Sequence, residues 1–249
     1  MKKTRPVFLM LIISWLLSAS CHSSKDLERS MQQPEAVRKL NLSHARLDSL
    51  PSSIGRMINL IELNLFNNKL TTLPPEIGDL QSLGELTASD NRITALPEEI
   101  KNLRSLKKLS LQFNKLTTLP AGIGELDSLE YLDLRHNNLK ELPEEIGNMK
   151  SLVYLYLGNN YLEKLPESIG RLQNLRFLYV GKNQLISLTD SIGQLRSLSE
   201  LDISGSGAAL AVPHTIRNLQ QLDVLFIDRG TQLPYNAVNI SSRLRVVYK

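Results

Sequence analysis

The chain contains few cysteine and aromatic residues, and its positive and negative charges nearly balance. Its 249 residues include one cysteine, one tryptophan and only 5% aromatic residues. A single cysteine excludes intrachain disulfides and any cysteine-based zinc finger. The formal net charge is +4, but Lys2, Lys3 and Arg5 all lie in the first five residues, so the remainder is close to neutral. A near-neutral body does not indicate nucleic-acid binding, and we expect no nucleic-acid partner.

Motifs that carry chemistry are also missing from the sequence. The four histidines, His22, His44, His136 and His214, have no metal-ligand spacing among themselves. The sequence contains neither the GxxxxGK[ST] pattern of a phosphate-binding loop nor a GxGxxG pattern after a strand. We therefore predict a protein that is not an enzyme and that has no cofactor and no metal site.

The first twenty residues have the three parts of an export signal. A positive start is followed by residues 7–17, which are apolar except for Ser14, and then by the small residues 18–20. The apolar run is about half of the ~20 residues that a transmembrane helix needs. These features predict a signal peptide over residues 1–20.

The only cysteine, Cys21, directly follows these small residues. Segment 17–21 resembles the lipobox of bacterial lipoprotein signals, although Ser18 stands at the usual leucine position and Leu17 lies one place further out. The resemblance implies that Cys21 is lipidated and anchors the exported protein to the bacterial cell envelope, at the outer membrane or cell surface. A secreted soluble protein with a plain signal peptide and a retained apolar anchor are the alternatives.

The rest of the chain repeats itself every 23 residues. Residues 106–128 fill the template LxxLxLxxNxLxxLPxxIxxLxx, and residues 129–151 fill it again with Met149 in place of the last leucine. Its first position is occupied by Leu60, Leu83, Leu106, Leu129, Leu152, Leu175 and Leu198, with Val37 starting the series. A coiled coil would need heptads and is excluded, whereas a fixed period of this length is typical of a solenoid.

This template resembles the leucine-rich repeat family, specifically its 23-residue LPxxI type, which includes Ras-group-related and bacterial surface proteins. The resemblance extends from about Val37 to Leu225. It implies an α/β solenoid: a horseshoe with a parallel concave sheet and short helical or 3-10 turns on the convex side. The alternation of leucine with polar residues in LxLxx itself predicts a short strand with one buried side.

One asparagine stands at the same phase of six repeats, just after the predicted strand. Because a buried asparagine can bond backbone groups that a turn leaves unpaired, we predict a structural ladder along the solenoid. Its members are Asn68, Asn91, Asn114, Asn137, Asn160 and Asn183. A solvent-exposed turn is the alternative environment for these side chains.

The pattern divides the chain into four parts. After the signal peptide, residues 21–36 hold the lipidated cysteine, a tether and an N-terminal cap, in which Leu27 and Met31 predict a short amphipathic helix before Pro34. Residues 37–221 form eight repeats. Residues 222–249 form a partial ninth repeat and a C-terminal cap, since an end repeat has no neighbour to bury its core. We expect the cap to use Val238, Ile240, Leu244, Val246 and Val247.

Nine strands are expected, and the residues beside their buried leucines face the concave surface. Aromatic residues collect at these positions in units five to seven, next to Gly158 and Gly181. The predicted partner-binding residues are Tyr131, Asp133, Arg135, Tyr154, Tyr156, Phe177, Tyr179 and Phe226. Aromatic residues also fit strands for local reasons, which is the simpler explanation. The alternation nevertheless directs these rings away from the core.

These features predict a monomeric protein-protein interaction module with a receptor, adhesin or scaffold role. A protein partner of unknown identity would bind the concave sheet, and the membrane would be contacted through the lipid anchor. A carbohydrate or cell-wall binder is the first alternative, with tyrosine rings stacked on sugars beside Asp133, Arg135 and Asn160. An intracellular signalling scaffold of the Ras-group kind is the second, and it requires that residues 1–20 are not a signal.

Overall fold

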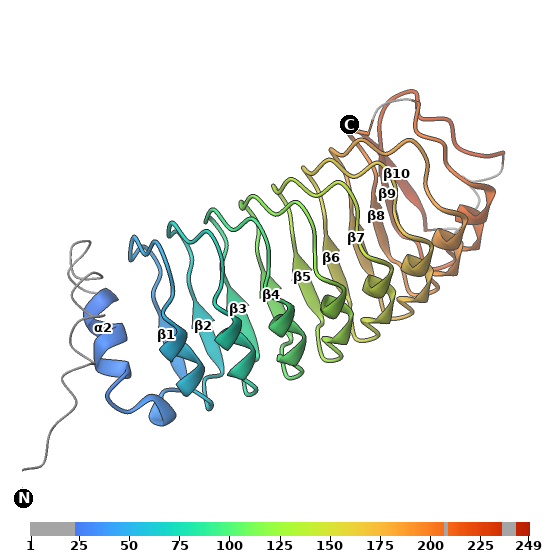
Figure 1. The fold of residues 1–249 in the computed structure, drawn as a ribbon. Coiled ribbons are helices and arrows are strands. Elements are labelled where there is room, and N and C mark those ends of the chain that lie inside the picture. The colour runs from blue at the N-terminus through green and yellow to red at the C-terminus, as the bar shows by residue number, and fades with distance from the viewer. Residues whose placement is uncertain (1–22, 207–208, 236–242) are drawn as a thin grey trace, which may run out of the picture.

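The computed structural model describes residues 23–206, 209–235 and 243–249. Within these residues, ten short strands form one parallel sheet whose spatial order follows the chain order (Figure 1). The strands are β1 (Lys39–Asn41), β2 (Glu62–Asn64), β3 (Glu85–Thr87), β4 (Lys108–Ser110), β5 (Tyr131–Asp133), β6 (Tyr154–Tyr156), β7 (Phe177–Tyr179), β8 (Glu200–Asp202), β9 (Val224–Ile227) and β10 (Arg245–Tyr248). The predicted fold class, a leucine-rich repeat solenoid, is confirmed.

The register of the sheet reproduces the period of the sequence. Leu109 pairs with Leu132, Leu132 with Leu155, and Leu155 with Leu178, each one 23 residues after the last. These leucines at the strand centres are fully buried, whereas the residues on either side of them point to the other face of the sheet. Equal register from β1 to β8 therefore stacks identical positions into columns, whereas the offset between β8 and β9 is 24 residues.

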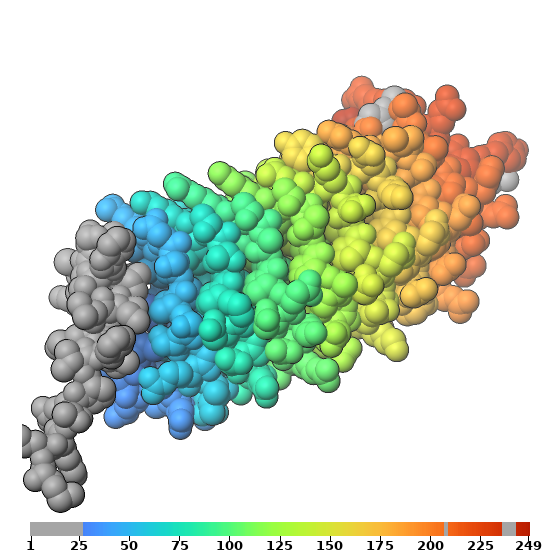
Figure 2. Space-filling view, in the orientation of Figure 1, coloured from blue at the N-terminus to red at the C-terminus, as the bar shows by residue number. Residues whose placement is uncertain are grey.

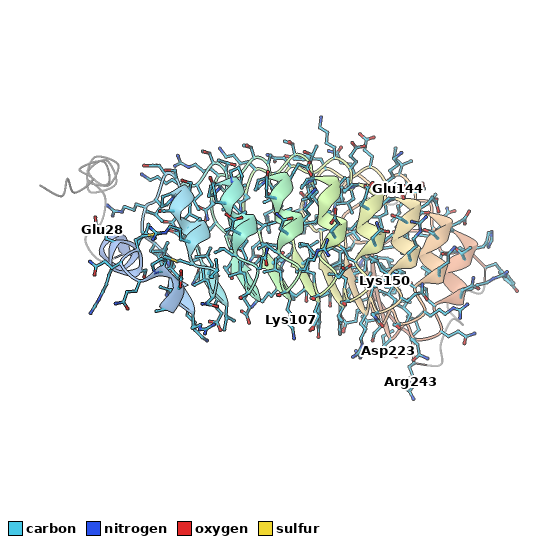
Figure 3. All side chains as sticks on the ribbon, turned by 60° about the horizontal axis from the view of Figure 1, so that its bottom comes forward. Glu28, Lys107, Glu144, Lys150, Asp223 and Arg243 are labelled. Atoms are coloured by element: carbon cyan, nitrogen blue, oxygen red, sulfur yellow. The ribbon has the colours of Figure 1, made fainter. Side chains whose placement is uncertain are left out.

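Short 3-10 helices cover the side opposite the sheet, in a row that runs along the whole molecule (Figure 3). In most repeats a proline precedes the turn, with φ near −67° as at Pro143, so its missing N–H leaves no bond unmade. The turns are η2 (Pro34–Ala36), η3 (Ser52–Arg56), η4 (Pro75–Asp79), η5 (Glu98–Asn102), η6 (Ala121–Glu125), η7 (Glu144–Asn148), η8 (Glu167–Arg171), η9 (Asp190–Gln194) and η10 (His214–Asn218).

The seventh unit replaces this proline by Thr189, and the turn keeps its geometry. Thr189 has φ −67° and ψ 147°, and its hydroxyl accepts a hydrogen bond from the backbone N–H of Ser191. A side-chain cap therefore takes the place of a rigid ring at the start of η9.

The asparagine column lies inside the molecule and connects neighbouring repeats. Asn137 is 4% exposed; its Oδ1 accepts from the backbone N–H of Leu116, at 3.0 Å. Its Nδ2 donates to the carbonyl oxygens of Leu111 and Leu134, both at 3.0 Å. The other five asparagines of the column make the corresponding bonds. Each one satisfies backbone groups of its own repeat and of the preceding one.

Both ends of the core are covered by residues outside the regular repeats. Helix α2 (Ser23–Ser30) precedes β1 and places Leu27 in the core, with Met31 packed against it. At the other end the sequence predicted nine strands, whereas β10 adds a tenth strand parallel to β9, and Leu244 and Val246 are partly buried beside it. The signal peptide over 1–20, Cys21, Val238 and Ile240 lie outside the described residues. The space-filling view shows the repeats in contact along the whole length (Figure 2).

Candidate functional site

Five aromatic side chains lie together on the exposed face of three neighbouring strands. We call this group the aromatic patch: Tyr131 on β5, Tyr154 and Tyr156 on β6, and Phe177 and Tyr179 on β7. The ring centroids of Tyr154 and Phe177 are 4.6 Å apart with an interplanar angle of 2°, and those of Tyr156 and Tyr179 are 5.1 Å apart at 9°. Parallel pairing in register places these rings side by side, half-buried by one another and outside the core.

An ion pair between an exposed guanidinium and a buried carboxylate supports one edge of the patch. The guanidinium of Arg135 donates from Nε to Oδ1 of Asp133, at 3.0 Å, and from Nη2 to Oδ2, at 2.7 Å. Its Cζ lies 4.9 Å from the centroid of the Tyr156 ring. Two bonds and a ring contact hold the guanidinium in one orientation.

The sequence predicted that Asp133 contacts a partner, but the structure encloses its side chain. The side chain lies on the expected face of the sheet but is 0% exposed, because Arg135 covers it and Tyr131 donates a further hydrogen bond to it. A surface partner does not reach a carboxylate that is enclosed in this way. Asp133 therefore positions Arg135, which is the exposed member of the pair.

Burial among the rings changes the acidity of the tyrosines. Desolvation, followed by the negative charge of Asp133, raises the pKa of Tyr131 to about 12. Desolvation also raises the pKa of Tyr156 and, together with the hydrogen bond to Glu200, that of Tyr179. The bond to Asp133 raises the pKa of Arg135. At neutral pH the patch therefore presents neutral phenols beside a permanent cation.

A depression of about 260 Å³ adjoins the patch where Gly158 and Gly181 follow β6 and β7. A Cβ on Gly181 would lie 2.7 Å from the carbonyl oxygen of Ser204 and 2.9 Å from Oδ1 of Asp202, so a side chain there would clash. Arg135, Lys182 and Lys249 line the depression together with Tyr156 and Tyr179. Three cations and the Asp202 carboxylate, which pairs with Lys249, thus line an opening beside the two glycines.

Phe226 is not part of the aromatic patch. It lies on β9, and strand β8 with Glu200 and Asp202 separates it from Tyr179. Nζ of Lys249 lies 4.5 Å from the Phe226 ring centroid and 2.7 Å from Oδ2 of Asp202. Sequence reasoning missed Lys249 as a neighbour of the patch, because it lies 47 residues after Asp202 and outside the repeat period.

The N-terminal half of the same face is polar. Lys39 pairs with Glu62, and Nζ of Lys108 lies 3.9 Å from Oε2 of Glu85. The hydroxyl oxygens of Ser89 and Ser110 are 2.9 Å apart and buried. These groups bond to one another across the strands, and the Phe66 ring on this half packs edge-on against His44, with the ring centroids 5.2 Å apart.

Two features are absent from the described residues. No group of three or more histidine, cysteine, aspartate or glutamate residues there could hold a metal ion. Among those same residues, no helix is sufficiently long and apolar to cross a membrane.

The chain belongs to the leucine-rich repeat family. A family model described as "Leucine-rich repeat region" matches residues 17–133 and 122–187. The assignment to the 23-residue LPxxI type stays a prediction. No curated protein matches the chain.

Solved structures resemble this solenoid. The leucine-rich repeat domain of the type III effector XopL is 24% identical with a TM-score of 0.78, covering 91% of this chain and 80% of that one, and it supports the fold alone. The plant peptide hormone receptor RGFR1 in complex with RGF2 is 26% identical with a TM-score of 0.60. The PEPR1 chain of a PEPR1–AtPEP1 complex is 28% identical with a TM-score of 0.61. This chain is covered over 85% in both comparisons but spans only 40% and 35% of those two chains.

Proposed function

We propose that this protein is an exported, non-catalytic interaction module that binds a protein partner on its concave sheet through the aromatic patch. The observation that carries the proposal is the group of five rings on the solvent side of β5–β7, four of them stacked and Tyr131 tilted against them. Rigid tyrosines near an interface centre are typical anchors of protein binding. The similar receptor structures, one of them solved with the peptide hormone RGF2, support a peptide or protein ligand.

The extent of the sheet fits such a partner. Strands of a parallel sheet lie about 4.8 Å apart, so the ten strands extend over roughly 43 Å. A standard interface buries about 800 Å² on each partner, which this face can supply. Beside the rings, the depression with Arg135 and Lys182 would accept an acidic group of the partner, while the rings supply the apolar contact.

The first prediction tests the aromatic patch by substitution. Tyr156→Ala combined with Tyr179→Ala removes two stacked rings from the exposed face and leaves the leucine core intact. We expect partner binding to weaken by about 2 kcal/mol or more per anchor, with the melting temperature within a few degrees of wild type. The measurement is titration against a partner captured from envelope and host extracts.

The matched control changes the polar half of the same sheet. Thr87→Ala with Gln112→Ala removes two half-buried side chains on β3 and just after β4, neither of them in a described side-chain bond. Binding by this variant should stay close to wild type. Full binding by the tyrosine variant together with loss in the control would place the site in units two to four and contradict the proposal.

A carbohydrate ligand is the second candidate. It is favoured by one observation, the depression in which Asp202, Ser204 and bare glycine backbone lie beside the Tyr156 and Tyr179 rings. Asp133 and Asn160, which were expected to contact a sugar, are both buried, the first against Arg135 and the second in the asparagine column, and neither contributes to it. Saturable binding of soluble cell-wall fragments that the tyrosine variant abolishes would favour this candidate over a protein partner.

The second prediction tests the proposed lipid anchor on Cys21. If Cys21 is acylated, the protein incorporates labelled palmitate and partitions into a detergent phase, since several acyl chains hold a protein firmly in an apolar phase. Cys21→Ala should abolish both results. The thermal melting of the repeats should not change, because Cys21 precedes every described element. Detergent-phase partition that survives in Cys21→Ala, without the palmitate label, would indicate a retained apolar segment instead.

A further inference from the structure

A second surface lies where each strand turns toward its 3-10 helix. Seven repeats place a residue with positive φ at this point, from His44 (φ 58°) to Lys182 (φ 58°), at intervals of 23 residues. We call this residue and the five that follow it, in each repeat, the turn edge. It consists of residues 44–49, 67–72, 90–95, 113–118, 136–141, 159–164 and 182–187.

Backbone hydrogen bonds keep the turn edge in register. The N–H of Lys69 donates to the carbonyl of Leu47, that of Arg92 to Leu70, and that of Lys115 to Ile93, at 2.8 to 2.9 Å. Each bond joins a repeat to the one before it. Side chains at the same phase therefore form straight columns along the edge.

One of these columns is a row of cations. Arg46, Lys69, Arg92 and Lys115 occupy the same phase of the first four repeats, and all four are exposed. Within the described part of the chain, none of the four takes part in an ion pair, whereas Lys39, Arg104, Lys107 and Lys108 all do. At about 4.8 Å per repeat, the four charges extend over roughly 15 Å.

The turn edge is the positive side of a nearly neutral protein. It carries seven lysines and arginines against four aspartates and glutamates. Outside the turn edge, the chain beyond residue 5 carries 19 lysines and arginines against 21 aspartates and glutamates. Two acidic residues, Asp48 and Asp90, lie near the cation column in the sequence. The Asp90 carboxylate accepts a hydrogen bond from the Asn67 side-chain amide.

Large apolar side chains continue the same edge toward the C-terminus. Phe113 is 50% exposed, Tyr161 47% and Ile186 69%. These three are among only eight large apolar residues that are exposed in the described chain. Tyr161 stands at the phase of the cation column, two repeats beyond Lys115. Exposed cations and exposed apolar side chains along one edge are the combination that binds at membrane interfaces.

We infer that the turn edge lies on an anionic lipid bilayer. Arg46, Lys69, Arg92 and Lys115 contact lipid phosphates, and Phe113, Tyr161 and Ile186 enter the headgroup region. The column begins in the first repeat, which follows helix α2, so the proposed acyl anchor on Cys21, two residues before that helix in the sequence, would hold the column close to the bilayer. A soluble polyanion would neutralise the cations but has no apolar region to bury Phe113, Tyr161 and Ile186.

The third prediction tests this inference with lipid vesicles. The probe is phosphatidylglycerol and phosphatidylcholine at 30:70, compared with phosphatidylcholine alone. The protein runs from His22 to Lys249, because this form contains every described element and lacks both Cys21 and the apolar segment. We expect cosedimentation with the anionic vesicles that falls with added salt. Removing the four column cations as alanine substitutions should lower the partition coefficient at least tenfold.

A matched control removes the same net charge elsewhere. Alanine at Lys39, Arg104, Lys107 and Lys108 deletes four paired cations that lie outside the turn edge. This variant should bind vesicles within about twofold of wild type. A third variant, with serine at Phe113, Tyr161 and Ile186, should lose the binding that resists salt.

Three results would overturn the inference: equal loss in both four-cation variants, equal binding to neutral vesicles, or binding of soluble polyphosphate without binding of vesicles. None of them bears on the aromatic patch, whose rings stay intact in all three variants. The absence of Cys21 from the tested protein likewise separates this result from the anchor experiment.

Discussion

At the scale of single residues, the aromatic patch is stabilised by side chains that bond within it. Tyr131 and Arg135 both donate to Asp133, and Tyr179 donates to Glu200. Rings with satisfied hydroxyl groups lose little conformational freedom when a partner binds, because their orientation is already fixed. Buried Asp133 thus contributes to the surface indirectly, by fixing the cation beside Tyr156.

The fourth prediction follows from the raised pKa of Tyr131. A pKa of about 12 in the folded state means that the folded protein keeps the phenol proton after the unfolded chain, with a pKa near 10, has lost it. The contribution of Tyr131 to the free energy of unfolding is therefore fully present below about pH 10 and decreases as the pH rises from about 10 to 12.

Urea melts of wild type and Tyr131→Phe at about pH 9 and about pH 11 measure this effect. The free energy of unfolding should decrease more in the wild type over this interval than in Tyr131→Phe. Lysine deprotonation affects both proteins equally and cancels in the comparison. Equal decreases in the two proteins would show that the phenol is not shielded.

At the scale of elements, the repeat was predictable because its determinants are local. A buried leucine at the centre of each strand, the asparagine and the proline all recur at fixed phases, so one template located β1 to β9 and the 3-10 turns. The tenth strand, Arg245–Tyr248, was not predictable in this way. It lacks the leucine template, and it pairs with β9 because β9 would otherwise leave an open edge.

The aromatic patch could be predicted only in part, for a related reason. Strand alternation located the five rings on one face, because the side-chain direction follows from the period of two. Enclosure is a property of neighbours from several repeats, as the burial of Asp133 beneath Arg135 demonstrates. The contact of Lys249 with Asp202 depends on a segment that follows no period.

The fifth prediction concerns the asparagine that links adjacent strands and turns in the middle of the stack. Asn137→Ala removes the acceptor for the buried N–H of Leu116 and the donor to two carbonyls. We expect the free energy of unfolding to fall by about 1–3 kcal/mol, since buried backbone groups lose their partners. Equilibrium denaturation monitored by circular dichroism measures the change.

Asn138→Ala is the matched control for this prediction, because Asn138 is the adjacent residue and is only half-buried. Its replacement should change the stability by less than about 0.5 kcal/mol. If both substitutions had the same small effect, water would be satisfying the backbone groups that we assign to Asn137.

At the scale of the whole molecule, the aromatic patch and the cation column occupy different repeats, and the turn edge meets the depression beside the patch at Asn159 and Lys182. The aromatic patch occupies the sheet in units five to seven, and the cation column runs along the turn edge of units one to four. A protein that rests on lipid by its turn edge would keep the sheet accessible from the side. The acidic starts of η5 and η7, with Glu98, Glu99, Glu144 and Glu145, belong to a third face, that of the 3-10 turns.

The equal register of the sheet also determines how the molecule responds to tension. Every strand bonds only to the strands before and after it, so a pull between the two ends loads the repeats in series. Each repeat that detaches would release 23 residues, or about 80 Å of extended chain. If flow or a moving cell pulled on a bound partner, the solenoid would therefore lengthen in steps as repeats unfold one after another.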